Sequence, residues 1–389
     1  MPWKNASITM QRKEFIEFAR QTGANVRELS RRYGVSPTTA YKWLSRYEEA
    51  GAEGLMDRSR RPATSPRRTS AEQERAVLAV HERYPYWGAR KLRQVLVNEG
   101  GVELPAVSTV VAILRRHGCQ VRGTGTMQKA WQRFNQPEPN RLWQMDFKGH
   151  FAAGSTRCHP LTVLDDHSRY ALCLRACAGE HGGYVRPALE AIFTRYGLPE
   201  RILCDNAGPW GTSERRARYT ALGVWLLRLG VDVVHGRPLH PQTQGKCERF
   251  HRSLQTEVLN QATPWRDLHH CQLHFDRWRQ SYNHERPHHA LDLATPASRY
   301  RPSLRSMPLI LPTLDYLPED HIRVVKTKGE ITFQNHFFFI GQAFAKLPVA
   351  LRHALPDGCF DVYFGWKRLG SIDLRTSLKS KFRYNSLLP

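Results

Sequence analysis

Two aspartates interrupt short apolar segments that are otherwise rich in strand-forming residues. Asp146 lies within residues 142–147, and Asp205 lies within residues 201–206. A carboxylate placed among such residues costs free energy unless a cation or hydrogen bonds compensate it. The fold must therefore bring compensating groups to both positions, which restricts how these two segments can be arranged.

A third acid, Glu248, lies in a segment with helical periodicity that follows a turn. Apolar residues recur at the helical period along one side of this segment, at Cys247, Phe250, Leu254 and Val258. Glu248 falls at the edge of that apolar stripe, where a side chain can reach a cleft beside a sheet. Three carboxylates meeting in one cleft would suit Mg²⁺ or Mn²⁺, which are hard ions that prefer oxygen ligands.

The segments around these acids resemble the three acidic motifs of the DDE transposases. Residues 143–146, 204–209 and 240–254 carry the likeness in chain order, and residues 282–296 resemble the tail of the same domain. The chain is similar to single-frame bacterial insertion-sequence transposases with an integrase catalytic core, which belong to the superfamily of retroviral integrases.

The resemblance implies a metal-dependent polynucleotidyl transferase. Asp146, Asp205 and Glu248 would be both the catalytic residues and the ligands of two Mg²⁺ (or Mn²⁺) ions per active site. The implied partner is double-stranded DNA, as transposon ends and as target, bound by at least a homodimer. The implied function is cleavage at the terminal repeats of an insertion sequence, followed by strand transfer. A non-catalytic helix-turn-helix regulator derived from a transposase and a ribonuclease-H-like nuclease without joining activity are the alternatives.

The chain departs from the resembled pattern at two points. Residues 206–247 separate Asp205 from Glu248, a longer spacing than in the best-known members of the family. Gln255 stands seven positions after Glu248, where relatives often carry a basic residue. We predict that Arg252, one turn after Glu248, makes that contact with the DNA end instead, and that Lys246 and Arg249 help to orient the end.

The charge balance agrees with a nucleic-acid partner. The 389 residues include 58 Lys and Arg against 35 Asp and Glu, a net charge of +23, which predicts a polyanionic partner and salt-dependent binding. No run of 18 apolar residues or signal peptide is found, and the eight cysteines form no C-x-x-C pair. We therefore expect no membrane association and a location in the bacterial cytoplasm, at the nucleoid.

The first part of the chain predicts two all-α DNA-binding modules. Residues 1–55 predict a helix-turn-helix domain, with a core of Leu29, Tyr33, Val35, Ala40, Trp43 and Leu44. Ser36 and Pro37 would start its second helix, whose predicted DNA-facing residues are Thr38, Thr39, Tyr41, Lys42 and Arg46. Residues 70–120 predict a second helix-turn-helix domain, with Ser108, Thr109, Arg115 and Arg116 facing DNA.

Two segments without core-forming residues flank the second module. Residues 56–69 form a basic linker that is either a solvated tether or an arm lying along a minor groove. Its candidate DNA contacts are Arg58, Arg60, Arg61, Arg67 and Arg68. Residues 121–138 predict a second linker, which is polar.

Residues 139–302 predict an α/β catalytic core with a mixed sheet, as in the ribonuclease-H-like fold of the resembled family. Three strands come first, at 142–149, 160–165 and 169–176. Helices and strands then alternate, at 183–197, 201–204, 214–229 and 231–234, before the helix that carries Glu248 and a last helix at 265–283. Asp165 and Asp166 lie in a turn between strands, and we interpret them as structural.

The end of the chain predicts a linker and a small β domain. Residues 303–319 are rich in proline, and residues 320–389 predict a small β-barrel DNA-binding domain with a tail. Its expected strands are 322–325, 330–333, 337–340, 360–364 and 369–372. Lys367 and Arg368 are the first candidate phosphate contacts, followed by Arg375, Lys379, Lys381 and Arg383, and a merely solvated tail is the alternative.

Overall fold

The computed structural model describes residues 8–57, 69–100, 104–119, 135–205, 209–211, 218–235, 245–261, 264–375 and 383–384. Contacts divide the chain into two compact units, Met1–Arg68 and Thr69–Pro389. Of the predicted DNA contacts, Arg58, Arg60, Arg61, Arg67, Arg68, Lys379 and Lys381 lie outside the described residues, and so does the Arg383 side chain. Within the described ranges, no helix is both long and apolar enough to cross a membrane.

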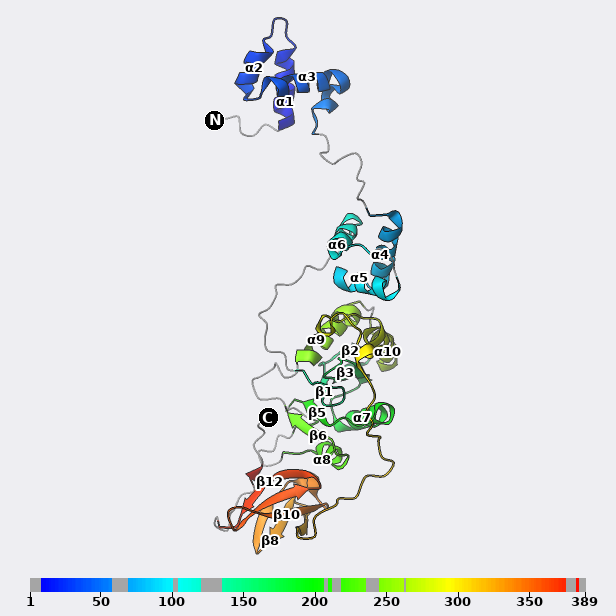
Figure 1. The fold of residues 1–389 in the computed structure, drawn as a ribbon, viewed down its shortest axis with the longest axis vertical. Coiled ribbons are helices and arrows are strands. Elements are labelled where there is room, and N and C mark those ends of the chain that lie inside the picture. Colours follow the sequence, from blue (N-terminus) through cyan, green and yellow to red (C-terminus); the bar gives the residue numbers. More distant parts are fainter. Residues whose placement is uncertain are drawn as a thin grey trace. The chain divides into compact units, whose positions relative to one another are not determined.

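The first unit is a small helical bundle built on a helix-turn-helix (Figure 1). Its elements are α1 (Ile8–Ala19), α2 (Val26–Tyr33), α3 (Pro37–Ala50) and the 3₁₀ helix η1 (Gly51–Leu55). Ser36 caps α3, since its hydroxyl accepts a hydrogen bond from the Thr39 amide at 3.2 Å. Ala40 is buried with Phe15 and Ile16, as the apolar periodicity requires. Val35 was wrongly assigned to the core: its side chain is 36% exposed, because it lies in the turn between α2 and α3.

A second three-helix module begins the other unit. It consists of α4 (Ala71–Arg83), α5 (Ala89–Asn98) and α6 (Val107–Arg116). Ser70 caps α4 by accepting a hydrogen bond from the Gln73 amide at 3.2 Å. Leu92 of α5 and Val110 of α6 are fully buried in the module's own hydrophobic core.

The region predicted to be the α/β core contains a mixed sheet, as expected (Figure 1). Its strands are β1 (Trp143–Phe147), β2 (Phe151–Ala153), β3 (Thr156–Asp165), β4 (Ala171–Cys177), β5 (Arg201–Cys204) and β6 (Asp232–His235). Strand β3 pairs antiparallel with β1, β2 and β4. Strand β5 pairs in parallel with β1 and β6, so the carboxyl ends of β1, β5 and β6 share one edge.

Helices cover both faces of this sheet. On one face α7 (Gly182–Tyr196) and α8 (Ala221–Arg228) bury the side chains of Trp143 and Met145. The opposite face carries α9 (Gly245–Leu254), its π-helical continuation η3 (Gln255–Leu259) and α10 (Leu268–His284). Two short helices follow, η4 (His289–Leu291) and α11 (Pro296–Arg299). The strands that carry the acidic residues therefore lie in the middle of three layers, between two layers of helices.

The two aspartates of the turn after β3 have structural partners, in agreement with their interpretation from sequence. Asp165 accepts hydrogen bonds from the Ser168 hydroxyl and amide and from the Asn140 amide. Asp166 accepts hydrogen bonds from the Gln136 amide and the Gln144 side chain. Both carboxylates are fully buried, so these bonds offset the free-energy cost of burying them.

The proline-rich segment 303–319 lies along the core. Arg305 donates to the carbonyls of Pro199, Leu229 and Gly230, the last two of which follow α8. Met307 and Leu311 pack against the core cluster beneath α7 and α8. The segment is therefore irregular in secondary structure and bound to the core by side-chain contacts.

The last domain is a small antiparallel β region and not a simple closed barrel. A five-stranded sheet joins β7 (His321–Val324), β10 (Pro348–Ala354), β11 (Cys359–Phe364), β12 (Lys367–Asp373) and β13 (Arg383–Tyr384). It packs on the hairpin of β8 (Glu330–Phe333) and β9 (His336–Phe339), through Phe333, Phe338 and Phe360. A 3₁₀ turn, η5 (Gln342–Phe344), precedes β10, a strand that sequence patterning missed.

Candidate active site

Asp146 and Asp205 lie on neighbouring parallel strands, at the same edge of the sheet. The register pairs Trp143 with Ile202 and Gln144 with Leu203, and its continuation sets Asp146 beside Asp205. Trp143 and Ile202 point into the core under α7 and α8. Because side chains alternate along a strand, the two aspartates share the opposite face, on which α9 packs.

Glu248 is in the first turn of α9, on this same face of the sheet. Cys247, Phe250 and Leu254 hold α9 to the sheet and are fully buried, in agreement with the predicted apolar stripe. The Glu248 side chain itself is exposed to solvent. The helix therefore presents its acid at the edge where the two aspartates lie.

The charge of Asp146 is poorly compensated by the protein. Burial and, next, the neighbouring charge of Asp205 raise the pKa of its carboxyl group to about 7, with smaller contributions from Glu180 and Glu248. Among these contributions, only the hydrogen bond from the Phe147 amide lowers the pKa of Asp146. In the described part of the chain, no Lys or Arg forms an ion pair with Asp146. The site therefore concentrates negative charge where a cation would be stabilised.

His251 lies between Asp146 and β3, a placement that sequence reasoning missed. Its Nδ1 is 3.9 Å from the Asp146 carboxylate, and its Nε2 is 2.9 Å from the Thr162 hydroxyl, which donates to the Asp146 carbonyl. Burial, and then the nearby Lys148, lower the pKa of His251 to about 4, so the ring is neutral near pH 7. His251 stands one turn after Glu248, and that spacing was the available signal.

Asp205 is held by an aromatic neighbour. The indole Nε1 of Trp210 donates to the Asp205 carboxylate, and the Trp210 ring stacks on Phe147 with centroids 5.5 Å apart. The Asp205 carbonyl also contacts Nδ1 of His235, at the end of β6, at 2.8 Å. These contacts fix the residue that follows β5 while leaving it at the edge of the sheet.

The donors gathered here fit a hard divalent cation, although they do not yet form a closed site. Asp146 and Asp205 supply carboxylate oxygens, the ligand type that Mg²⁺ and Mn²⁺ prefer. Among the residues with described positions, no three His, Cys, Asp or Glu side chains are grouped to hold one ion. Glu248 is the acid that has to turn inward to complete such a group.

The three cations predicted near Glu248 differ in their surroundings. Lys246 is 16% exposed and pairs with the buried Asp166 at 2.5 Å, and its Nζ also contacts the Asp166 carbonyl at 3.0 Å. Burial lowers the pKa of Lys246 to about 8, and the charge of Asp166 partly opposes that shift. Arg249 and Arg252 are exposed on α9. We therefore retain Arg249 and Arg252 as candidate DNA contacts and assign Lys246 to the support of the Asp166 turn.

The candidate DNA contacts of the two helical modules lie on exposed or partly exposed faces. On α3 the side chains of Thr38, Tyr41 and Lys42 are exposed, and those of Thr39 and Arg46 are partly buried. On α6, Ser108 and Arg115 are exposed and Thr109 is partly buried. Arg116 is exposed but pairs with Glu74 of α4, a contact that also organises the module.

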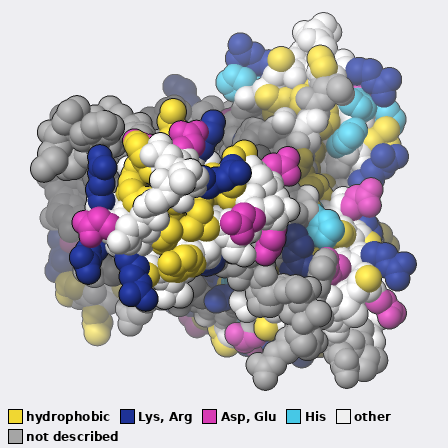
Figure 2. All heavy atoms as spheres, turned by 90° about the horizontal axis from the view of Figure 1, so that it is seen from above, with side chains coloured by type: hydrophobic (Ala, Val, Ile, Leu, Met, Phe, Trp, Pro, Cys, Tyr) yellow, Lys and Arg dark blue, Asp and Glu magenta, His cyan; other side chains and the backbone are white. Residues whose placement is uncertain are grey.

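The basic residues of β12 make intramolecular ion pairs. Lys367 pairs at 2.7 Å with Asp232 of β6, which ties the β domain to the core, and Arg368 pairs with Asp361 at 2.6 Å. These contacts account for both side chains, so we do not carry them forward as phosphate contacts. Figure 2 shows Lys and Arg side chains interspersed with Asp and Glu on the face it draws.

The raised pKa of Asp146 predicts a pH-dependent stability effect. Its folded-state pKa of about 7 exceeds the usual 3.8, so ionisation destabilises the metal-free fold progressively as pH rises from about 4 through 7. Asp146→Asn cannot ionise. In EDTA, we expect it to have a Tm several degrees above that of the parent chain at pH 8, with the difference disappearing near pH 4. Scanning fluorimetry across this range, with exposed Asp292→Asn as control, measures the effect; a pH-independent difference would contradict it.

Family models match several parts of the chain. The description "Integrase core domain" applies to two models, matching residues 136–241 and 229–296. A model described as "Helix-turn-helix domain" matches residues 11–63, and one described as "Homeodomain-like domain" matches residues 39–114. Residues 320–380 match the model "IS481 family transposase, C-terminal domain".

Individual proteins are similar over large parts of the chain. An insertion element IS407 uncharacterized 31.7 kDa protein from Burkholderia multivorans is 29% identical over 57% of this chain and 78% of its own length. A putative transposase for insertion sequence element IS986/IS6110 from Mycobacterium tuberculosis is 24% identical over 69% of this chain and 99% of its own.

Solved structures that match parts of the chain include integrases. A chain of the simian T-cell lymphotropic virus intasome in complex with PP2A regulatory subunit B56 gamma has a TM-score of 0.37 and 15% identity, covering 80% of this chain and all of that one. The HTLV-2 integrase catalytic core domain in complex with magnesium has a TM-score of 0.32 and 14% identity, covering 42% of this chain and 97% of that one.

Proposed function

Because the chain belongs to the insertion-sequence transposases of the retroviral integrase superfamily, we propose that it binds the terminal repeats of an insertion sequence and catalyses metal-dependent DNA cleavage and strand transfer. One observation carries the catalytic part. Asp146 and Asp205 sit side by side at a sheet edge beneath the helix of Glu248, and no Lys or Arg among the described residues forms an ion pair with Asp146. Such an arrangement is suited to binding divalent cations.

In this proposal Asp146, Asp205 and Glu248 would together hold two divalent ions through their carboxylate oxygens. When bound, the ions lower the pKa of the attacking water or DNA 3′-hydroxyl and stabilise the departing 3′-oxygen. Water as nucleophile gives cleavage, and a 3′-hydroxyl gives strand transfer, so one site serves both steps. No Ser or Tyr side chain has to form a covalent link with DNA.

The surrounding residues position these acids. Trp210 holds Asp205 through its indole N–H, and Thr162 holds the backbone of Asp146. His251 remains neutral near pH 7 and so can accept a hydrogen bond beside Asp146 without adding charge. Arg249 and Arg252 are exposed on the helix of Glu248, where phosphates of the DNA end would pass.

The two helical modules supply recognition of the ends in this proposal. Exposed Thr38, Tyr41 and Lys42 on α3, and Ser108 and Arg115 on α6, are of types that contact base edges and phosphates. Two modules in one chain can read a longer site than one module. A homodimer or a larger assembly would bring two ends together for a coordinated reaction.

Labelled duplexes of the element's ends test the proposal when they are incubated with the purified chain, Mg²⁺ and a target plasmid. We expect end cleavage and covalently joined products, both absent in EDTA. Nicked ends without joined products would favour a nuclease without joining activity. Binding without either product would favour a non-catalytic regulator, and either result would overturn the proposal.

Changes on α3 should weaken end binding selectively. We expect Lys42→Ala to reduce affinity uniformly across DNA sequences and to make the salt dependence shallower by about one unit of slope. Tyr41→Ala should reduce affinity for the end about 5- to 100-fold. It should also reduce the ratio between the affinity for end DNA and the affinity for unrelated DNA. Anisotropy titrations at several salt concentrations measure both effects, with exposed Gln11→Ala on α1 as the matched control. Unchanged affinities in both variants would remove α3 from end recognition.

A further inference from the structure

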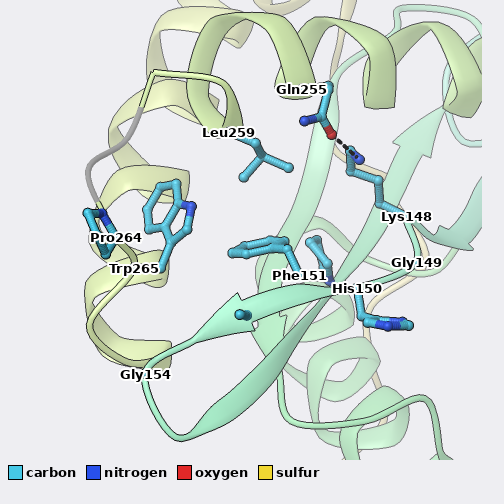
Figure 3. Close-up of a pocket in the computed structure, with 11 residues that line it drawn as sticks. Lys148, Gly149, His150, Phe151, Gly154, Gln255, Leu259, Pro264 and Trp265 are labelled. Atoms are coloured by element: carbon cyan, nitrogen blue, oxygen red, sulfur yellow. Dashed lines mark hydrogen bonds between the residues drawn. The ribbon is translucent and has the colours of Figure 1, made fainter.

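A pocket of about 550 Å³ opens next to the acidic edge of the sheet (Figure 3). Lys148 and Phe151 line it from the end of β1 and the start of β2. Gln255 and Leu259 line it from η3, and Trp265 lines it from the loop before α10. Its volume lies within the range of about 300–1,000 Å³ that is typical of small-molecule sites, which is room for a single nucleotide.

The pocket has an apolar side and a cationic end. Figure 3 shows the side chains of Phe151, Leu259 and Trp265 turned toward one another across the pocket, with Lys148 and Gln255 at its other end. The Phe151 and Trp265 rings lie 5.6 Å apart, at 52° to one another. Aromatic rings beside a cation are the combination on which bases of single-stranded nucleic acid stack.

The cationic end is fixed in place and retains binding capacity. Lys148 Nζ donates to Gln255 Oε1 at 2.6 Å, while Gln255 Nε2 donates to Asn260 at 2.6 Å. The Gln255 amide is thus oriented from both ends and directs the ammonium group. Across the described ranges, Lys148 makes no ion pair with a carboxylate, and one of its three N–H donors is used by Gln255. The remaining donors can reach acceptors on a base or phosphate.

The aromatic side is also preformed. The Gly154 amide, in the turn between β2 and β3, donates to the Trp265 carbonyl at 2.7 Å. Gly154 has φ +61°, and a Cβ atom there would lie 2.0 Å from the Arg266 carbonyl oxygen, so only glycine allows this approach. The hairpin therefore holds the loop that carries Trp265. Across the pocket, Gln255 and Leu259 belong to a π-helical turn, a geometry often found at functional sites.

The pocket's place in the sequence ties it to the proposed reaction. Lys148 follows Asp146 by two residues, and Gln255 follows Glu248 by seven on the same continuous helical segment. Two extended residues span at most about 7 Å. That length corresponds to about two nucleotides along a stacked strand. A base in this pocket would thus lie close to the phosphate under attack.

We propose that this pocket holds one unpaired base of the DNA end, within about two nucleotides of the scissile phosphate, stacked against Trp265 and Phe151 and contacted by Lys148. The proposal rests on the proposed function, since it assumes that DNA ends react at Asp146 and Asp205. Taking a base out of the stack costs free energy, and stacking in the pocket offsets that cost. Gln255 is a positioning residue that fixes Lys148.

The test compares two probes bound to the full chain in Ca²⁺: a duplex end, and the same end with its last three base pairs mismatched. We expect the parent chain to bind the mismatched end about 5- to 150-fold more tightly. Trp265→Ala should abolish that preference by weakening binding of the mismatched end more than binding of the duplex end, and Trp265→Phe should largely restore it. Lys148→Met should reduce it, and Phe337→Ala, which removes an aromatic residue 62% exposed on β9, should not.

Abasic positions in the mismatched end allow a double-mutant cycle between the DNA base and Trp265. One abasic position should remove the preference of the parent chain and have no further effect in Trp265→Ala, because both changes remove the same stacking contact. Equal affinity of the parent chain for intact and abasic mismatched ends, with duplex binding retained, would overturn the pocket assignment alone. If the parent chain failed to bind or process duplex ends at all, the proposed function itself would be overturned.

Discussion

Replacing Asp146 by Asn, Asp205 by Asn or Glu248 by Gln should each abolish DNA cleavage and joining while leaving binding of the ends nearly intact. Each change removes a negative charge from a site whose proposed ions stabilise charge in the transition state. That stabilisation amounts to several kcal/mol, so we expect a loss of about 10³-fold or more in the rate of each step. Single-turnover assays on labelled ends measure cleavage, and precleaved ends with a target plasmid measure joining.

Nearby acids serve as controls for this experiment. Glu180 lies close enough to raise the pKa of Asp146, but it is bonded to His159 at 2.9 Å, so Glu180→Gln should retain most activity. If a variant of Asp146, Asp205 or Glu248 kept near-normal joining activity, the substituted residue would not belong to the proposed site. Equal loss of end binding and of chemistry would instead indicate a folding or DNA-binding defect.

Removing Arg286 should cause the largest loss of stability. Its guanidinium pairs with Glu257 at 2.8 Å, both side chains are about nine-tenths buried, and it also donates to Ser253 at 3.0 Å. Glu257 further accepts the Trp278 indole N–H at 2.9 Å, so the network joins η3 to α10. Arg286→Ala leaves a buried carboxylate without its cation, which costs about 3–5 kcal/mol. We expect the Tm of the core to fall by on the order of 10 °C.

The double variant Arg286→Met, Glu257→Gln separates the charge effect from packing. It removes both charges, so it should recover much of the stability lost in Arg286→Ala. Arg299→Ala, which removes an exposed arginine on α11, should change stability by less than about 0.5 kcal/mol. Thermal unfolding measures the stability of each variant. If Arg286→Ala were nearly as stable as the parent chain, Glu257 would have to find another partner in the variant.

The regular elements of the core could be predicted because local patterns determine them. The strand predicted at 201–204 is β5, and the helix predicted at 183–197 is α7, displaced by one residue at each end. The short strand β2 and the interior strand β10 were missed. Three residues of β2 carry too little periodicity, and β10 begins at a proline, which weakens a strand pattern.

The surroundings of the acids could be predicted only in part. Sequence patterning places Asp146 and Asp205 on apolar strands and Glu248 on a helix, but the register that sets the aspartates side by side is tertiary. The contacts of His251 with Thr162 and of Lys148 with Gln255 join residues about 90 and 107 positions apart. Sequence patterning also predicted Lys246 as a DNA contact, but its ammonium group pairs with the buried carboxylate of Asp166.

The position of Mn²⁺ in crystals of the full chain bound to an end duplex, located by anomalous scattering, tests directly whether the three acids form one metal site. We expect two peaks at the sheet edge, within about 2.0–2.6 Å of carboxylate oxygens of Asp146, Asp205 and Glu248 together. Peaks bound elsewhere, or a Glu248 carboxylate still turned to solvent beside an occupied pair of aspartates, would contradict it.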